Sequence, residues 1–239
     1  MLYDETVNTY LRGEKFDNGA KIDLDVEKSN ILYRDEYLLQ VSKNKNILHL
    51  GFVDHLPLLD EKIKKGNWLH NKLTDISNKC YGIDINQEGI EYIQDTYKYD
   101  NLYALDVISD IIPKDILDIK FDYLLIPDVI EHIGNPVEFL IAIRDRFQNN
   151  VKKIILTTPN GFRWDNFINT FKKQEVINTD HRFWFTPFTL SKIVSDAGYQ
   201  IDYLDYFEHG TLSRRQMIKK TILNRYPTFR DTLIIEIRL

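Results

Sequence analysis

The sequence predicts an α/β fold, a doubly wound sheet that is mostly parallel. Short apolar runs alternate along the chain with stretches of helical pattern, which is typical of βαβ units. Two of these runs, at 122–126 and 153–157, are almost continuously apolar, as strands buried on both faces are. The length of 239 residues suits one large domain or two small ones. Together these observations favour a single layered domain.

The order of elements follows from these patterns. Strands are predicted at 46–51, 79–84, 101–105, 121–126, 151–158, 199–206 and 232–239. Helices are predicted at 27–43, 61–77, 86–97, 135–147 and 187–197. Asn135 before Pro136 indicates a capped helix start, and Gly198 indicates a helix end. We expect residues 1–45 to form an N-terminal extension and 46–239 the main domain, with one antiparallel strand near its C-terminus.

Charge is distributed unevenly along the chain. There are 31 Lys and Arg against 36 Asp and Glu, a formal charge of −5, and 43% hydrophobic residues exclude extensive disorder. Residues 210–239 hold seven basic and two acidic residues, so the rest of the chain is acidic. An acidic body argues against nucleic-acid binding, which usually needs a basic domain. The basic end leaves room for a local anion site.

Cysteine usage and the terminal sequence narrow the class further. Cys80 is the only cysteine, which excludes an intrachain disulfide and a zinc site made of cysteines. The chain contains no run of 18 apolar residues, so no membrane span is predicted. The N-terminus is acidic and lacks an apolar run, so no signal peptide is predicted. We therefore expect a cytoplasmic protein.

Acidic residues stand at the carboxyl ends of the predicted strands, where open parallel sheets bind ligands. Asp84 ends the second strand, and a carboxylate there can accept hydrogen bonds from both hydroxyls of a ribose. Asp106 ends the third strand and can accept from an exocyclic amine such as that of adenine. Either residue alone could merely cap the helix that follows. Two of them on successive strands predict an adenosine-sized site.

The order and spacing of these strand ends resemble class I S-adenosylmethionine-dependent methyltransferases over about residues 29–206. The resemblance is strongest at 121–133, 156–161 and 197–199. An Asp-Val-x-Glu-His block such as that at 128–132 is common in small-molecule and sugar methyltransferases. The resemblance implies a Rossmann-like methyltransferase sheet. It also implies methyl transfer to a hydroxyl of a sugar or sugar-derived metabolite. The Leu-His-Leu-Gly-x-Val-Asp-His loop at 48–55, followed by Trp-Leu-His at 68–70, resembles a subset of bacterial methyltransferases linked to surface-polysaccharide biosynthesis.

The resemblance also implies a cofactor site for S-adenosylmethionine at four strand ends. Its members would be His49, Gly51, Phe52, Asp84, Ile85, Asp106, Val107 and Pro127. The first three would lie against the methionine part, Asp84 would hold the ribose, and Asp106 would hold the adenine amine. The backbone near Pro127 would hold the amino group of the cofactor.

The glycine loop departs from the family pattern. Val53 and His55 stand where the family has its second and third glycines, and glycine permits a close backbone approach that valine does not. This departure is the basis for an alternative function, a non-catalytic binding or regulatory protein of the same fold. The loop also argues against a dehydrogenase, because Gly-x-Gly-x-x-Gly is absent and Asp84 follows Gly51 by far more than about 20 residues.

The Asp-Val-x-Glu-His block carries the predicted chemistry. Asp128, Glu131 and His132 would share one face of a helical turn beside the transferable methyl group. We expect His132 to act as general base, since an imidazole titrates near neutrality; alternatively, it only hydrogen-bonds the fold. With His181, the block resembles the metal-ligand set of small-RNA terminal 2′-O-methyltransferases, which would give His181 a catalytic role. Its Asp-x-x-Glu-His half also resembles ubiquinone-pathway O-methyltransferases. Because position 128 is Asp where those families have Glu, a divalent metal is the less favoured alternative.

The acceptor pocket is expected to use residues late in the chain. Asn160, Arg163, Trp164 and the aromatic run at 181–185 suit a sugar or nucleotide acceptor. Residues 210–231 lie between the last two predicted strands, where the family often inserts a substrate lid, so the resemblance implies a lid there. Its basic pairs at 214–215 and 219–220 could hold a phosphate, which makes a phosphorylated or nucleotide-linked sugar a candidate; alternatively, they form a solvated helix face. The competing enzymatic reading is N-methylation of a small amine, in which Asp128 or Glu131 would bind the cation.

Overall fold

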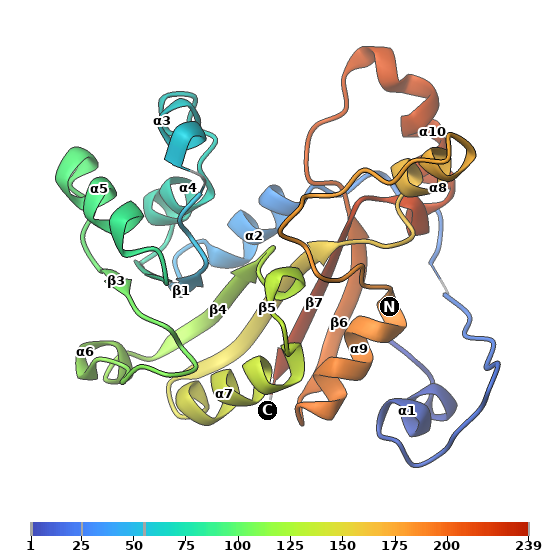
Figure 1. Cartoon of the computed structure of the whole chain (residues 1–239), viewed down its shortest axis with the longest axis horizontal. Coiled ribbons are helices and arrows are strands. Elements are labelled where there is room, and N and C mark those ends of the chain that lie inside the picture. The colour runs from blue at the N-terminus through green and yellow to red at the C-terminus, as the bar shows by residue number, and fades with distance from the viewer. Residues whose placement is uncertain (1, 25, 55, 239) are drawn as a thin grey trace.

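The computed structural model describes residues 2–24, 26–54 and 56–238. In these ranges the chain forms a seven-stranded sheet of order β3-β2-β1-β4-β5-β7-β6 (Figure 1). The strands are β1 (Asn46–Leu50), β2 (Lys79–Asp84), β3 (Leu102–Ala104), β4 (Phe121–Pro127), β5 (Val151–Pro159), β6 (Gln200–Phe207) and β7 (Thr232–Arg238). All pairs from β3 to β5 are parallel, and β7 runs antiparallel to both β5 and β6. The predicted fold class is confirmed.

Helices cover both faces of the sheet. They are α1 (Glu5–Leu11), α2 (Arg34–Ser42), α3 (Leu56–Lys64), α4 (Leu69–Ile76), α5 (Gln87–Tyr97), α6 (Lys114–Leu117), α7 (Pro136–Phe147), α8 (Trp164–Phe171), α9 (Pro187–Asp196) and α10 (Met217–Arg225). Three 3-10 turns are η1 (Ile130–His132), η2 (Arg214–Gln216) and η3 (Pro227–Phe229). No helix in the described ranges is long and apolar enough to cross a membrane.

The central strands are apolar on both sides because both sides are covered. Leu124 and Leu156 belong to the core that the sheet forms with α7 and α9. Their neighbours Leu125 and Ile155 belong to a second core, shared with α2 and α4. Since successive side chains of a strand point to opposite faces, a strand between two cores must be apolar throughout.

Two helix predictions were wrong. The helix expected at 61–77 is two helices, α3 and α4, because Gly66 adopts a left-handed conformation (φ +64°) between them. The helix expected at 27–43 begins only at Arg34. Helices α1, α6, α8 and α10 were not predicted, and the four residues of α6 are too few to show a helical period.

The N-terminal segment returns to the strand ends of the sheet. Helix α1 packs against α9, where Lys192 Nζ donates to the carbonyl of Leu11 at 2.7 Å. The chain then runs along one side of the molecule to α2 (Figure 1), and Tyr33 forms an isolated parallel bridge with Glu208 at the end of β6. Leu38 of α2 is completely buried in the second core. This packing places the first turn of α2 beside the carboxyl ends of the strands.

Candidate active site

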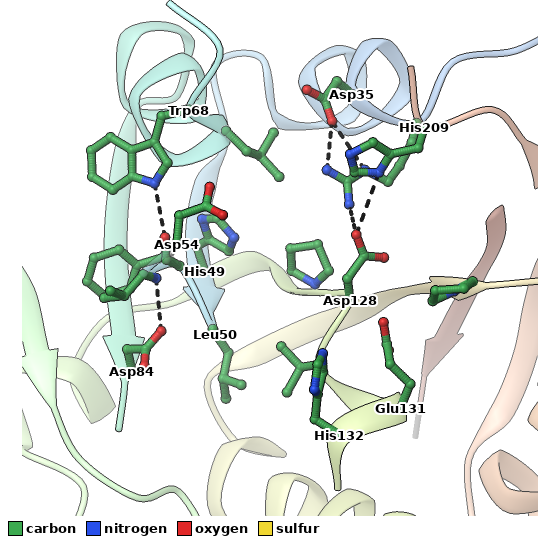
Figure 2. Close-up of a pocket in the computed structure, with 18 of the residues that line it drawn as sticks. Asp35, His49, Leu50, Asp54, Trp68, Asp84, Asp128, Glu131, His132 and His209 are labelled. Atoms are coloured by element: carbon green, nitrogen blue, oxygen red, sulfur yellow. Dashed lines mark hydrogen bonds and ion pairs between the residues drawn. The ribbon is translucent and has the colours of Figure 1, made fainter. Parts of the chain in front are cut away.

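A cavity of about 1650 Å³ opens at the carboxyl ends of the parallel strands. Small-molecule sites are usually about 300–1,000 Å³, so this cavity has room for two ligands side by side. All twelve residues predicted for the cofactor and for catalysis line it, and Figure 2 shows several of them around the opening. Their meeting in one cavity is a fact of the geometry, and the role of each stays a prediction.

The loop after β1 has one of the expected glycines in a positive-φ conformation and Val53 in place of another. Gly51 has φ +73°, and a Cβ there would lie 2.3 Å from Cγ2 of Val129, so this position accepts only glycine. The Val53 side chain lies over Gly89 of α5, where a Cβ would come within 2.6 Å of its Cγ1. The missing loop glycine is therefore compensated by a glycine in the facing helix. His55 lies outside the described residues.

Asp84 fastens this loop to β2. Its Oδ2 accepts from the Val53 N–H at 2.9 Å and its Oδ1 from the Asn86 N–H at 3.0 Å (Figure 2 draws the first contact). Burial raises the pKa of Asp84 above the ordinary value, and the backbone hydrogen bonds oppose that rise. Each carboxylate oxygen can accept a second hydrogen bond, so the residue retains capacity for a ribose. Ile85 next to it is 78% exposed and presents a bare apolar side chain to the cavity.

Asp106 shapes the loop after β3. Its oxygens accept from the Ile108 N–H at 2.8 Å and from the Ser109 hydroxyl at 3.1 Å. Val107 is buried and lines the cavity from the same loop. The turn thus holds the Asp106 carboxylate at the cavity, in reach of a ligand on that side.

His49 and Phe52 belong to a buried aromatic group under the cavity. His49 is 2% exposed, its Nδ1 lies 3.2 Å from Nδ1 of His70, and its Nε2 has no hydrogen-bond partner among the described residues. Burial and the neighbouring imidazole lower the pKa of His49 far below the ordinary value, so its ring is neutral. The ring of Phe52 packs against His70 and Trp68, whose Nε1 donates to the Phe52 carbonyl at 3.0 Å.

Arg34 is a site residue that the sequence analysis missed. It is 6% exposed and bonds to the carboxylates of Asp35 and Asp128, while Asp128 also accepts from the Thr157 hydroxyl at 2.8 Å. Arg34 and Asp128 are far apart in sequence, so only the fold brings them together. A weak signal was present, because an arginine in the first turn of a helix opposes the helix dipole.

The helical turn predicted over 128–132 is not formed as such. Asp128 has φ +53° at the end of β4, and the 3-10 turn η1 begins only at Ile130. The Asp128 carboxylate is held by Arg34, whereas Glu131 accepts from the Thr158 hydroxyl at 3.0 Å. The block thus divides into an ion-paired carboxylate and a separate Glu-His pair.

Glu131, His132 and His181 form a cluster in which one donor atom from each lies within 4.8 Å of the others. His181 Nε2 is 3.9 Å from Oε1 of Glu131, and the two imidazole rings meet edge to face at 4.7 Å. Glu131 Oε1 and His181 Nδ1 are buried without a hydrogen-bond partner among the described residues. Burial and the charge of Asp128 raise the pKa of Glu131, and burial lowers the pKa of His181. Near neutral pH the cluster therefore combines a neutral carboxyl with a neutral imidazole, a pair suited to moving a proton.

The chain after α8 delivers His181 to this cluster. The Arg182 N–H donates to the carbonyl of Glu131 at 2.8 Å. The Arg182 guanidinium lies over Gly134, where a Cβ would come within 2.5 Å of it. Further along, Asn160 and Phe185 form an isolated parallel bridge.

The expected acceptor residues are only partly at the cavity. Arg163 lines it and stacks on the ring of Trp184 at 4.7 Å. Asn160 is fully buried and donates to the carbonyls of Thr228 and Arg230, so it serves the fold. Trp164 is not among the residues that line the cavity, and it faces η3 instead.

Comparisons with known proteins bear on the fold. No protein-family model matches the chain, and no curated protein matches it in sequence. A small-RNA methyltransferase HEN1 is 16% identical, with a TM-score of 0.55 over 92% of this chain and 27% of that one. A Haloferax volcanii methyltransferase complexed with the activator Trm112 is 13% identical (TM-score 0.54; 85% and 87% covered). Magnesium protoporphyrin IX methyltransferase from Synechocystis, with bound SAH, is 15% identical (TM-score 0.51; 85% and 81% covered).

The fold is that of the class I S-adenosylmethionine-dependent methyltransferases. At these identities the likeness concerns the methyltransferase fold alone. The chain spans about a quarter of the length of the HEN1 chain that it matches. Any function of this chain must therefore be argued from its own cavity.

Proposed function

We propose that this chain transfers a methyl group from S-adenosylmethionine to a hydroxyl of a polar small molecule, a sugar or sugar-derived metabolite. The observation that carries the proposal is that one cavity is lined by chemically different residues on two sides, at the ends of β2 and β3 on one side and beyond β4 on the other. Asp84, Ile85 and Asp106 line a half suited to an adenosine. The Glu131, His132 and His181 cluster lines the other half, where a hydroxyl can lose its proton.

The residues of the first half fit the cofactor. Asp84 would accept from the ribose hydroxyls, Ile85 would cover one face of the adenine, and Asp106 would accept from its amine. Gly51 lets the backbone approach the methionine part closely, and the backbone near Pro127 would meet its amino group. This assignment weakens the non-catalytic alternative, because the Val53 side chain is directed at Gly89 while its N–H bonds to the Asp84 carboxylate.

The second half fits deprotonation of a hydroxyl. When bound, S-adenosylmethionine would supply a methyl group on a sulfonium sulfur, so that an O–C bond to the methyl carbon could form in line as the C–S bond breaks and the neutral thioether leaves. His132 takes the hydroxyl proton, and the ring of His181 packs edge to face against the ring of His132. The neutral Glu131 carboxyl places no competing negative charge beside the departing proton.

The amine alternative lacks a free carboxylate for the substrate cation. Asp128 is already paired with Arg34, and burial keeps Glu131 uncharged near neutral pH. A small ammonium substrate would therefore find no unpaired negative charge in the block. The geometry favours a hydroxyl acceptor.

Metal-assisted O-methylation is a second candidate, favoured by the unpartnered Oε1 of Glu131 and Nδ1 of His181 among the described residues. Two imidazoles and a carboxylate are suitable ligands for a divalent transition metal. A metal held by them would lower the pKa of an acceptor hydroxyl. Asp128 would not join the set as positioned, because Arg34 and Thr157 hold its carboxylate.

Calorimetry with S-adenosylmethionine and S-adenosylhomocysteine tests the function directly. Both should bind, and the affinity for S-adenosylhomocysteine should be unchanged in His132→Ala while methylation of nucleotide sugars and free sugars falls. If neither cofactor form binds, the proposal is wrong. Unchanged turnover in His132→Ala would favour an amine acceptor, and loss of turnover with a chelator, restored by Mn²⁺, would favour the metal route.

A further inference from the structure

Helix α8 and the chain around η3 carry five aromatic side chains in mutual contact, here called the aromatic ridge. They are Trp164, Phe167, Phe171, Tyr226 and Phe229, with successive ring centroids 5.1–6.3 Å apart. Phe167, Phe171 and Tyr226 are 46%, 72% and 52% exposed. Large apolar side chains gathered on one surface usually mark a contact with a partner or a membrane.

Helix α8 is amphipathic without a core to face. Trp164, Phe167, Ile168 and Phe171 follow the spacing of one helix face, the face that a helix normally buries. None of the eight described residues of α8 is buried. Figure 1 shows the helix beside α10, beyond the end of the sheet. Its apolar face meets the ring of Phe229 but stays largely open.

Helix α10 adds aliphatic side chains to the same region. Met217 and Ile218 are 69% and 80% exposed, and they lie away from Leu223, which is fully buried beneath the helix. Lys219 Nζ forms an ion pair with Asp165 at 3.2 Å, which joins the first turn of α10 to the first turn of α8. The aromatic ridge and this aliphatic pair therefore belong to one surface, which we call the α8–α10 surface.

The α8–α10 surface is basic, although the chain is acidic. Residues 162–177 and 215–229 contain seven of the 31 basic residues and only two of the 36 acidic ones. Lys172 and Lys173 follow Phe171 directly and are exposed. Arg225 lies over the ring of Tyr226 at 5.4 Å and borders a groove of about 400 Å³ that also contains Lys28. Exposed apolar groups thus stand among cations, and a complementary partner must be apolar and anionic.

We propose that the α8–α10 surface docks onto an anionic lipid bilayer. Aromatic and aliphatic side chains would enter the interfacial region, while the lysines and Arg225 would bind headgroup phosphates. A second copy of the chain is disfavoured, because a two-fold interface would set this basic surface against itself. A single-stranded nucleic acid could stack on the aromatic rings, but it would leave Met217 and Ile218 without apolar contacts.

The proposed surface adjoins the cavity. Arg163 lines the cavity directly before Trp164, and Thr211 lines it shortly before η2 and α10. Docking would therefore hold the acceptor side of the cavity close to the bilayer. The docking does not depend on the methyltransferase assignment, because it requires no cofactor.

Flotation of the full chain with vesicles tests the proposal. The protein should float with vesicles of equal parts phosphatidylcholine and phosphatidylglycerol at low salt, and should stay behind with phosphatidylcholine alone. Neutralising Lys172 and Lys173 to Gln should lower the partition coefficient about thirtyfold, from the contribution of two basic residues at an anionic surface. Phe171→Ser should lower it about tenfold or more, since the ring no longer enters the interface.

Matched control variants distinguish binding through this surface from nonspecific binding of the protein to vesicles. Phe16→Ser removes an aromatic ring that is 87% exposed elsewhere, and Lys114→Gln removes an exposed lysine of α6; neither should change flotation. Absence of flotation with the anionic vesicles, or an equal loss in the control variants, would overturn the proposal. Two other results would also overturn it if the protein fails to float with the anionic vesicles. They are concentration-dependent dimerisation that is lost in Phe171→Ser, and retardation of single-stranded RNA that is lost in Phe171→Ser.

Discussion

Replacing Gly89 by alanine should lower the free energy of unfolding of the wild-type protein. The same replacement should be tolerated in a variant in which Val53 is glycine. In the structure, Val53 Cγ1 occupies the space beside the Cα of Gly89, and a Cβ at position 89 would lie 2.6 Å from it. The same Cβ would lie 3.1 Å from the side chain of Asn86, which caps α5. The two positions therefore compete for one volume.

The magnitude follows from two opposing terms. Forcing an extra methyl group into a packed site costs about 1–3 kcal/mol. Alanine in a helix is worth about 1 kcal/mol more than glycine, somewhat less in the first turn. Gly89→Ala alone should thus lower the free energy of unfolding by up to about 2 kcal/mol. In a Val53→Gly background the first cost disappears, so the coupling between the two positions should be about 2 kcal/mol.

Urea denaturation of the four proteins of this cycle measures the coupling. Calorimetry with S-adenosylhomocysteine should follow the same order, because Val53 N–H also bonds the Asp84 carboxylate. Gly19→Ala is the matched control, since nothing lies within 4 Å of a Cβ there and its φ is not positive. Effects that add to within about 0.5 kcal/mol would refute the idea that Gly89 compensates for the missing loop glycine.

Three further predictions concern the cavity. Gly51→Ala should destabilise the fold by about 2 kcal/mol or more, through its positive φ and its contact with Val129, and Val129→Ala should restore part of that loss in urea denaturation. Arg34→Ala should lower the free energy of unfolding by about 2 kcal/mol, less than for a fully buried ion pair, because its carboxylate partners keep a quarter or more of their side-chain surface exposed. Burial raises the pKa of Glu131 from 4.5 to about 8, so its contribution to stability is present below 4.5 and is lost as the pH rises to about 8. Glu131→Gln should remove that slope, which is at most about 1.4 kcal/mol per pH unit, from urea midpoints measured between pH 5 and 9.

The strands could be predicted because burial on both faces leaves a direct trace in composition. The first and last residues of every predicted strand lie within two residues of those of an observed strand, as the prediction at 121–126 and the observed β4 illustrate. Helices were harder to predict. Apolar residues continue on both sides of Gly66, so the sequence pattern does not reveal that α3 ends and α4 begins there. Helix α8 was missed although its apolar spacing is regular, because its eight residues form little more than two turns and repeat the period too few times to stand out.

The cavity lining could be predicted for a related reason. In a parallel sheet, the residues that follow each strand meet at one edge, so strand ends identify the lining before any contact is known. Arg34 escaped this reasoning because it comes from a helix before the first strand, and only tertiary packing carries it to Asp128. His181 was expected from a family resemblance, and spacing alone would not have joined it to Glu131 across fifty residues.

The separation of Asp128 from its neighbours limits what the Asp-Val-x-Glu-His block can do. An aspartate is one methylene shorter than a glutamate, and here its carboxylate is bound by Arg34 and Thr157 on the side of α2 and β5. Glu131 is left as the only carboxyl among the cluster with His132 and His181 in the described residues. Burial then favours the neutral form of that carboxyl, and either a proton or a divalent cation satisfies the unpartnered Oε1. The pH slope of the stability, measured with and without Mn²⁺, therefore distinguishes the two: a slope that persists unchanged at saturating Mn²⁺ means that the cluster holds a proton.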